Sequence, residues 1–314
     1  MPLDPKLREI IRSSPPSPAD PDSVPAEEIR RAADARMLAL QGAKEEVGSV
    51  EDLSARGREG DIRVRIYRPR AGARGLPLVV YYHGGGFVYY SVETHDNICR
   101  LISRMSGAAV MSVDYRLAPE HKFPAAVNDA YDALRWAAEN AGRIGIDPGR
   151  VAVAGDSAGG NLAAAVSLMA RDEGARDLIR AQVLLYPVLN MVDMSPSRFE
   201  FAEGYLLDER MDRWFVRQYL ADPRDAYSPY ASPILASDLS GLPPALVVTA
   251  EYDMLRDQGE VYAHRLRAAG VDATATRYLG MTHGFLRFYP VLRAARDAIA
   301  QVAGYLRETL NAPG

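Results

Sequence analysis

The 314-residue sequence lacks the features that would connect it to several large classes of protein. Its single cysteine, Cys99, excludes an internal disulfide, so packing has to hold the fold, which suits a reducing compartment. The net charge is −4, and without a basic surplus we expect no nucleic-acid partner. No apolar run approaches the roughly 18 residues of a membrane span, and the N-terminus MPLDPKLREI lacks the apolar stretch of a secretory signal. We therefore expect a cytoplasmic protein without stable membrane insertion.

Motifs for metals and nucleotides are also missing. The five histidines are scattered, no H-E-x-x-H sequence occurs, and there are no paired cysteines. Neither of the glycine-rich nucleotide patterns, G-x-x-x-x-G-K-[ST] and G-x-G-x-x-G, is present. We therefore predict neither a metal site nor a nucleotide site of these kinds.

What the sequence does contain is material for a large core, with 48% hydrophobic and 25% charged residues. Five short apolar runs are nearly continuous, as expected for strands covered on both faces: Leu78–Tyr82, Ala109–Val113, Val151–Ala154, Val183–Tyr186 and Ala245–Val248. Helix-like segments separate most of them, at about 94–106, 125–141, 159–172, 258–269 and 291–310. In addition, Asp61–Tyr67 alternates apolar and polar residues, which predicts an antiparallel edge strand. The pattern predicts an α/β fold with a mostly parallel central sheet and helices on both faces.

Two segments break this alternation. Residues 1–45 hold a proline-rich stretch, which we expect to be extended, followed by a helical pattern from Ala26 to about Gln41. Residues 190–225 form a polar insertion between two predicted strands. We predict that 1–45 is a helical cap segment and that the insertion serves as a lid on a main domain spanning 46–314.

The strongest local pattern is Gly155-Asp156-Ser157-Ala158-Gly159-Gly160, placed directly after a predicted strand and before a predicted helix. A G-x-S-x-G sequence in that setting is typical of a nucleophile elbow. Its glycines permit a tight, strained turn that raises the serine above the sheet. We predict that Ser157 is a nucleophile; the alternative is an ordinary glycine-rich turn.

A second pattern, His83-Gly84-Gly85-Gly86, follows another predicted strand. Acyl transfer passes through a tetrahedral oxyanion, which backbone N–H groups stabilise when nothing obstructs them. The candidate donors are Gly84, Gly85 and Ala158. The alternative, a phosphate-binding nest, normally comes with a nucleotide motif, and this sequence has none.

Together these patterns resemble the hormone-sensitive-lipase-like carboxylesterases, a family of α/β-hydrolases. The resemblance spans about 80–290 and also includes Asp114-Tyr115-Arg116-Leu117-Ala118-Pro119-Glu120, Asp253-Met254-Leu255-Arg256-Asp257 and His283-Gly284-Phe285. It implies an α/β-hydrolase fold whose cap combines N-terminal helices with the insertion after the sixth strand. It further implies a catalytic domain over 46–314 that hydrolyses small carboxylic esters without a cofactor, and a homodimer formed through an edge strand.

In this fold the serine is followed by an acid and then by a histidine. Asp253 lies just past a predicted strand, where parallel sheets carry active-site groups, and the family's D-P-L-R-D pattern selects it. The chain departs from that pattern at Met254, where the family usually has proline. Glu251 and Asp257 compete as the acid, but Asp257 begins the next helix, and we expect it to cap that helix or pair with an arginine.

Histidine titrates near neutral pH, so a base that takes and returns a proton is expected to be one. His83 belongs to the glycine loop, His95 and His121 precede the serine, and His264 lies within a predicted helix. His283 follows a strand-like run in a short loop. We therefore predict His283 as the general base.

These residues predict a serine esterase that hydrolyses short- to medium-chain esters through an acyl-enzyme intermediate. An amidase, thioesterase or peptidase with the same triad is an alternative, because the triad does not specify the leaving group. A non-catalytic small-molecule receptor of the same fold is another, although a receptor would not need an intact base. Candidate pocket walls, which are equally compatible with ordinary packing, are Phe87, Tyr89, Tyr90, Tyr205, Leu206 and Leu207.

Overall fold

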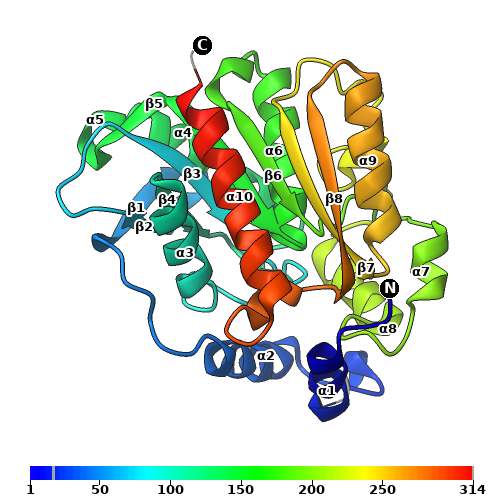
Figure 1. Cartoon of the computed structure of the whole chain (residues 1–314). Helices are drawn as coiled ribbons and strands as arrows, with labels where there is room; N and C mark the ends of the chain where they lie inside the picture. The colour runs from blue at the N-terminus through cyan, green and yellow to red at the C-terminus, as the bar shows by residue number, and fades with distance from the viewer. Residues whose placement is uncertain (16–17, 313–314) are drawn as a thin grey trace.

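A computed structural model describes residues 1–15 and 18–312. Its centre is an eight-stranded sheet in the order β1-β2-β4-β3-β5-β6-β7-β8 (Figure 1). The last six of these strands are parallel, whereas β1 pairs with β2, and β2 with β4, in antiparallel register. The strands are β1 Ser49–Gly57, β2 Gly60–Arg68, β3 Leu76–Tyr82, β4 Ala109–Asp114, β5 Ile146–Asp156, β6 Ala181–Leu185, β7 Ala245–Tyr252 and β8 Ala273–Thr282.

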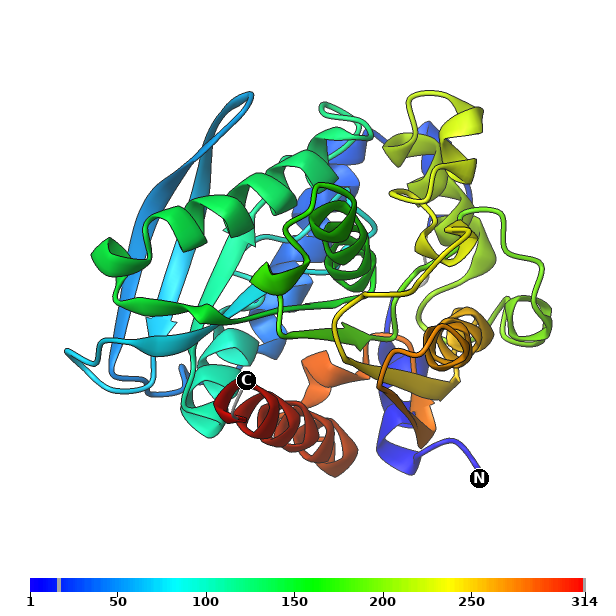
Figure 2. The same cartoon turned by 90° about the horizontal axis from the view of Figure 1, so that it is seen from above.

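Helices cover both faces of this sheet (Figure 2). On one face lie α4 (Ala125–Glu139), α6 (Ala158–Asp172) and α9 (Arg256–Ala268), and on the other lie α3 (Asp96–Ser106) and α10 (Arg293–Asn311). Because successive side chains of a strand point to opposite faces, Val80 and Tyr82 of β3 join the first core cluster while Val79 and Tyr81 join the second. This two-sided burial explains the nearly continuous apolar runs.

The strand predicted over Asp61–Tyr67 forms as β2, but its predicted place at the edge is wrong. Strand β1 pairs along its outer side and takes the edge. Only Ala55 and Gly57 of β1 are buried, so its sequence has no apolar run that would reveal a strand. The two edges of the sheet are therefore β1 and β8.

The two segments outside the alternating pattern meet beyond one end of the sheet (Figure 1). The first contributes α1 (Pro5–Ser13) and α2 (Ala26–Leu40), and the second contributes α7 (Pro196–Glu200) and α8 (Glu209–Tyr219). An ion pair between Arg217 and Asp22 joins them, and Arg210 Nη1 donates to the carbonyl of Ala19 at 3.0 Å. The stretch expected to be extended contains a 3-10 turn, η1 (Pro21–Ser23), and residues 16–17 lie outside the described residues.

The remaining elements are short connections: α5 Ala141–Ile144, η2 Arg176–Leu178, η3 Pro223–Tyr227, η4 Pro233–Leu235 and η5 Phe285–Phe288. Within residues 1–15 and 18–312, no helix has the length and apolar character needed to cross a membrane.

Candidate active site

Ser157 lies in the sharp turn between β5 and α6. Its φ of 56° is in the left-handed region, and its N–H donates to the carbonyl of Leu185 at 2.8 Å. A Cβ added to Gly155 would lie 2.2 Å from the carbonyl oxygen of Gly159, and one added to Gly159 would lie 1.9 Å from that of Tyr82. Only glycine fits at both positions, which is why the motif spaces its glycines around the serine.

The structure brings the three predicted triad residues together at the carboxyl ends of β5, β7 and β8. His283 Nε2 lies 2.9 Å from Ser157 Oγ, and His283 Nδ1 lies 2.9 Å from Asp253 Oδ2. Asp253 is 1% exposed, and its other carboxylate oxygen accepts the N–H of Leu255 at 2.9 Å. A carboxylate beside Nδ1 keeps the proton on that nitrogen, which leaves Nε2 available to accept the serine proton.

The two competing carboxylates are engaged elsewhere. Asp257 accepts from the N–H of Ser197 in α7 and from Arg256 Nε, both at 2.8 Å. The expected arginine pair is therefore present, but Asp257 does not cap the helix, because the N-cap residue of α9 is Leu255 and the Asp257 carboxylate bonds these two groups instead. Glu251 accepts the N–H of Gly280 at 2.6 Å.

The glycine loop corrects one predicted oxyanion donor. The N–H of Gly84 donates to Asp156 Oδ1 at 3.0 Å, so it is not free to bind an oxyanion. Gly85 and Gly86 line the cavity beside Ser157, and Ala158 begins α6 directly after the serine. The sequence does not reveal that Gly84 is already bonded, because its partner, the buried Asp156 carboxylate, lies 72 residues away in the chain.

Asp156 itself is a hub between separate elements. Besides Gly84, it receives the hydroxyl of Tyr81 at 2.8 Å, and His95 Nε2 lies 3.3 Å from it. Burial works to raise the pKa of Asp156, but the charge and hydrogen bonds of His95, with the hydroxyl of Tyr81, outweigh it and bring the pKa below its ordinary value. The result is a buried carboxylate that joins the glycine loop to the serine turn.

His83, the first residue of the glycine loop, is a buried neutral histidine. Its ring stacks on Tyr115 with the centroids 4.3 Å apart, and its Nδ1 lies 2.7 Å from the carbonyl oxygen of Gly84. Burial, followed by the charge of nearby His95, lowers the pKa of His83 to about 3. Its role is therefore to support the loop and not to transfer protons at neutral pH.

Helix α2 holds the segment that follows the glycine loop. Arg30 Nε donates to the carbonyl of Val88 at 2.7 Å, and Asp34 accepts the N–H of Tyr90 at 2.8 Å. Met37 of the same helix lines the cavity. The N-terminal segment therefore contacts both the wall of the site and the loop that shapes it.

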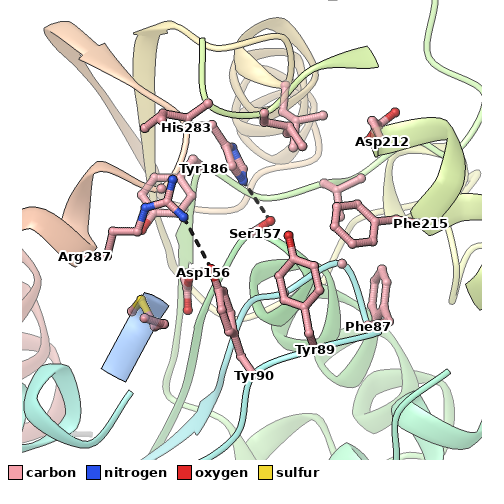
Figure 3. Close-up of a pocket in the computed structure, with 18 of the residues that line it drawn as sticks. Phe87, Tyr89, Tyr90, Asp156, Ser157, Tyr186, Asp212, Phe215, His283 and Arg287 are labelled. Carbon is pink, nitrogen blue, oxygen red and sulfur yellow. Dashed lines mark hydrogen bonds between the residues drawn. The ribbon is translucent and has the colours of Figure 1, made fainter. Parts of the chain in front are cut away.

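A cavity opens above Ser157, between the sheet and the two outer segments (Figure 3). Five of the six candidate wall residues line it, namely Phe87, Tyr89, Tyr90, Leu206 and Leu207. Tyr205 does not. Its ring packs between Phe201 and Tyr252, each with centroids 5.3 Å away, so the prediction for this residue is wrong.

The wall also contains charged residues that the sequence did not single out, among them Asp212 of α8 and Arg287 of η5. Asp212 pairs with Arg198 at 2.8 Å, and burial raises the pKa of its carboxyl against the opposing effect of Arg198. The available signal for Arg287 was a single charge within an otherwise apolar stretch, whereas Asp212 stands among other charged residues and gave no such signal. That signal is weak in a chain with so many arginines.

No group of three or more histidine, cysteine, aspartate or glutamate side chains among residues 1–15 and 18–312 is arranged to hold a metal ion.

Comparisons with known proteins agree with the fold described above. A family model described as alpha/beta hydrolase fold matches residues 79–287. An arylesterase of Saccharolobus solfataricus is 42% identical over 91% of this chain and 93% of its own length. An ethyl acetate hydrolase of Pseudomonas putida is 38% identical over 91% of each chain. Among solved structures, an esterase of Pyrobaculum calidifontis superimposes with a TM-score of 0.93 at 51% identity, covering 99% of this chain and 100% of that one.

Proposed function

Because this chain belongs to the alpha/beta hydrolase fold family and is a carboxylic ester hydrolase, we propose that it cleaves short- to medium-chain esters through an acyl-enzyme on Ser157. One observation carries the proposal. Asp253, His283 and Ser157 form an unbroken line with two 2.9 Å contacts, and the line ends at the floor of the cavity.

The proposed reaction begins when Ser157 Oγ attacks the ester carbonyl while His283 Nε2 removes its proton. Asp253 keeps the imidazole in the required tautomer and stabilises its cationic form. His283 then gives the proton to the departing alkoxide, which leaves an acyl-serine. Water attacks this ester by the same route in reverse and restores the free serine.

For the oxyanion we propose the backbone N–H groups of Gly85, Gly86 and Ala158. Two arguments support Gly86 in place of Gly84. Gly86 lines the cavity, whereas the N–H of Gly84 is already donated to Asp156. Donors that are fixed before the reaction stabilise the developing charge most effectively, since they need not reorient when it forms.

Substrate size is proposed from the cavity and from the relatives. Apolar and aromatic side chains form most of the cavity wall, as they do in sites for small molecules, and the names of two relatives refer to aryl esters and ethyl acetate. We propose that residues 1–45 and 190–225 form a cap that limits chain length. Met37, Leu207 and Phe215 support this, because these two segments place them on the cavity wall.

A substrate panel tests the reaction class. Matched esters, amides and thioesters should show a strong preference for the oxygen esters, with the acyl-enzyme trapped as a covalent adduct on Ser157 in a mass spectrum. Faster turnover of the amide or thioester, or an adduct at another residue, would contradict the proposal.

Met37 and its neighbour Leu38 test the cap. Met37 is 3% exposed and lines the cavity, whereas Leu38 is 48% exposed. In Met37→Ala the specificity constants should shift toward longer acyl chains, since each methylene that gains apolar contact contributes about 0.8 kcal/mol. Leu38→Ala is the control. Identical profiles for esters of two to twelve acyl carbons in both variants would remove α2 from the substrate site.

A cytoplasmic location and a homodimer formed through an edge strand stay predictions. The exposed edges available for such a dimer are β1 and β8. Light scattering on the purified protein decides the oligomeric state.

A further inference from the structure

We propose that the guanidinium of Arg287 binds a carboxylate carried by the substrate, so that the enzyme accepts esters with an anionic group at the end of one substituent. This inference rests on the proposed function, because it assigns a specificity to the same cavity. It concerns the part of the ester that does not react.

The charges on the cavity wall carry the argument. Apart from histidines, the charged residues that line the cavity are Asp156, Asp212 and Arg287. Asp156 is satisfied by its donors from other elements, and Asp212 is paired with Arg198. Within residues 1–15 and 18–312, Arg287 has no carboxylate within 4.0 Å.

The hydrogen bonds of Arg287 are also incomplete. Its Nη1 reaches the hydroxyl of Tyr90 only at 3.4 Å. Its Nε is buried and has no hydrogen-bond partner among the described residues. A guanidinium normally presents five N–H donors, so most of its binding capacity is unused beside a cavity that admits substrate. A carboxylate is the group whose geometry matches this planar fork.

The position of the side chain fits such a role. Arg287 follows His283 by four residues and lies on the opposite side of Ser157 from Asp212 and Phe215 (Figure 3). The guanidinium carbon lies 5.0 Å from the centre of the Phe288 ring, and the guanidinium also contacts Gly284, where an added Cβ would meet that carbon at 3.4 Å. The charge is therefore held in place at one end of the cavity.

At this end of the cavity, Met37 and Leu206 lie in the core cluster to which Tyr90 also belongs. The ring of His95 packs beside Tyr90 with the centroids 5.6 Å apart, and Asp156 lies 3.3 Å from His95 and is already bonded to its own donors. A charge-assisted hydrogen bond in such surroundings is stronger than one exposed to water. The same charge would repel a cationic substituent. An ester with a terminal carboxylate is therefore the substrate class that this end of the cavity recognises.

The simpler alternative is that Arg287 only covers the ring of Phe288. Its removal would then affect neutral and anionic esters equally. The test therefore uses pairs of substrates that differ in charge and hardly in shape.

One pair places the charge on the acyl side, monoethyl glutarate against ethyl 5-amino-5-oxopentanoate. The other places it on the alcohol side, 4-acetoxybutanoate against 4-acetoxybutanamide. Specificity constants are measured by pH-stat titration in wild type, Arg287→Gln and Arg287→Lys. Arg293→Gln, which removes an 89% exposed arginine at the start of α10, is the matched control.

In at least one pair we expect Arg287→Gln to lower the anionic-to-neutral ratio by about tenfold to a hundredfold, as for the loss of a charged hydrogen bond. Arg287→Lys should retain most of the ratio, and Arg293→Gln all of it. The pair that responds identifies the side of the ester that faces Arg287. A ratio that is unchanged in both pairs would overturn the inference while leaving the esterase proposal intact.

A second measurement needs no variant. Glutarate should inhibit hydrolysis of the neutral esters by wild type at concentrations at which glutaramide does not, and added salt should weaken this inhibition. Equal inhibition by the two compounds would count against the carboxylate site. If wild type hydrolysed none of the four esters, the proposed esterase function itself would be contradicted. If it hydrolysed them without any preference for the anionic ester, only the role of Arg287 would be contradicted.

Discussion

The sheet and the cap hold their residues in different ways. All seven residues of β3 are buried, and strands on both sides fix their positions. Of the fifteen residues of α2, only Ile29 and Met37 are buried. The ion pair between Arg217 and Asp22, which joins the two cap segments, is about half exposed at each end, and such pairs typically contribute only about 0–1 kcal/mol.

This contrast suits two different tasks, placement of the reacting atoms and selection among substrates. Bond-making chemistry requires atoms placed within a fraction of an ångström, and dense packing on both faces of a sheet provides that precision. Selection among substrates requires a wall that can change without disturbing the reacting atoms. In our proposal, the more exposed outer segments and side chains such as Arg287 form that wall.

The largest effect on activity is expected for Ser157→Ala, which removes the proposed nucleophile at the end of the sheet. We expect ester hydrolysis to fall at least about 10⁴-fold, because no other group can form the acyl intermediate. Ser167→Ala, in the helix that follows Ser157, is the control, because its hydroxyl bonds the carbonyl of Ala163. Rates with an aryl acetate, after circular dichroism has shown folded protein, decide the matter. Retention of more than a tenth of wild-type turnover in Ser157→Ala would disprove the nucleophile.

The two aspartates near the end of β7 give the next largest effect. Asp253→Asn should lower turnover about 10³- to 10⁴-fold, because an amide cannot hold the histidine tautomer and stabilise its charge in the same way. Asp257→Asn should leave turnover nearly unchanged and reduce stability by about 1 kcal/mol, since it weakens the contact with Ser197. Both are measured by steady-state rates and urea unfolding. A deeper loss of turnover at Asp257 would mean that the acid has been misassigned.

Gly86→Ala tests the point where the sheet and the cap meet. A Cβ there would lie 2.3 Å from the ring of Phe215, and the φ of 60° disfavours alanine. We expect kcat to fall about a hundredfold through displacement of the oxyanion loop. Gly142→Ala, which adds a Cβ in open space without a positive φ, is the control. A normal kcat in Gly86→Ala would show that the loop tolerates displacement.

The smallest effect concerns stability and pH. Because burial lowers the pKa of His83 to about 3, the folded protein keeps this ring neutral while the unfolded chain, with its ordinary pKa of 6.5, takes up a proton. Stability should therefore be complete above pH 6.5 and decrease by about 1.4 kcal/mol per pH unit as the pH falls toward 3. Urea unfolding of wild type and His83→Asn between pH 7 and 5 measures the difference in slope. Parallel slopes would refute the buried neutral histidine.

The sequence was informative where one local pattern determines the outcome. Apolar runs predicted β3 to β7 because strands buried on both faces have little choice of residue. The sequence pointed to Ser157, Asp253 and His283, whose positions follow strand ends. It was uninformative where a distant side chain decides. Gly84 and Gly86 look alike in the sequence, but only the N–H of Gly84 is bonded to Asp156. Tyr205 and Leu206 are neighbours, but Leu206 lines the cavity whereas Tyr205 stacks on Tyr252.

The bonds of Asp156 have a consequence for how this protein can change. At Ser157, activity can be removed while the fold is expected to persist, so the two properties are separable. At Asp156 they are not, because its carboxylate bonds Tyr81 of β3 and Gly84 of the glycine loop and contacts His95, which precedes α3. A substitution there would leave buried donors unpaired and release the glycine loop in the same step. Asp156, which occupies the first x of the G-x-S-x-G motif, is therefore a position where we expect any substitution to change stability and turnover together.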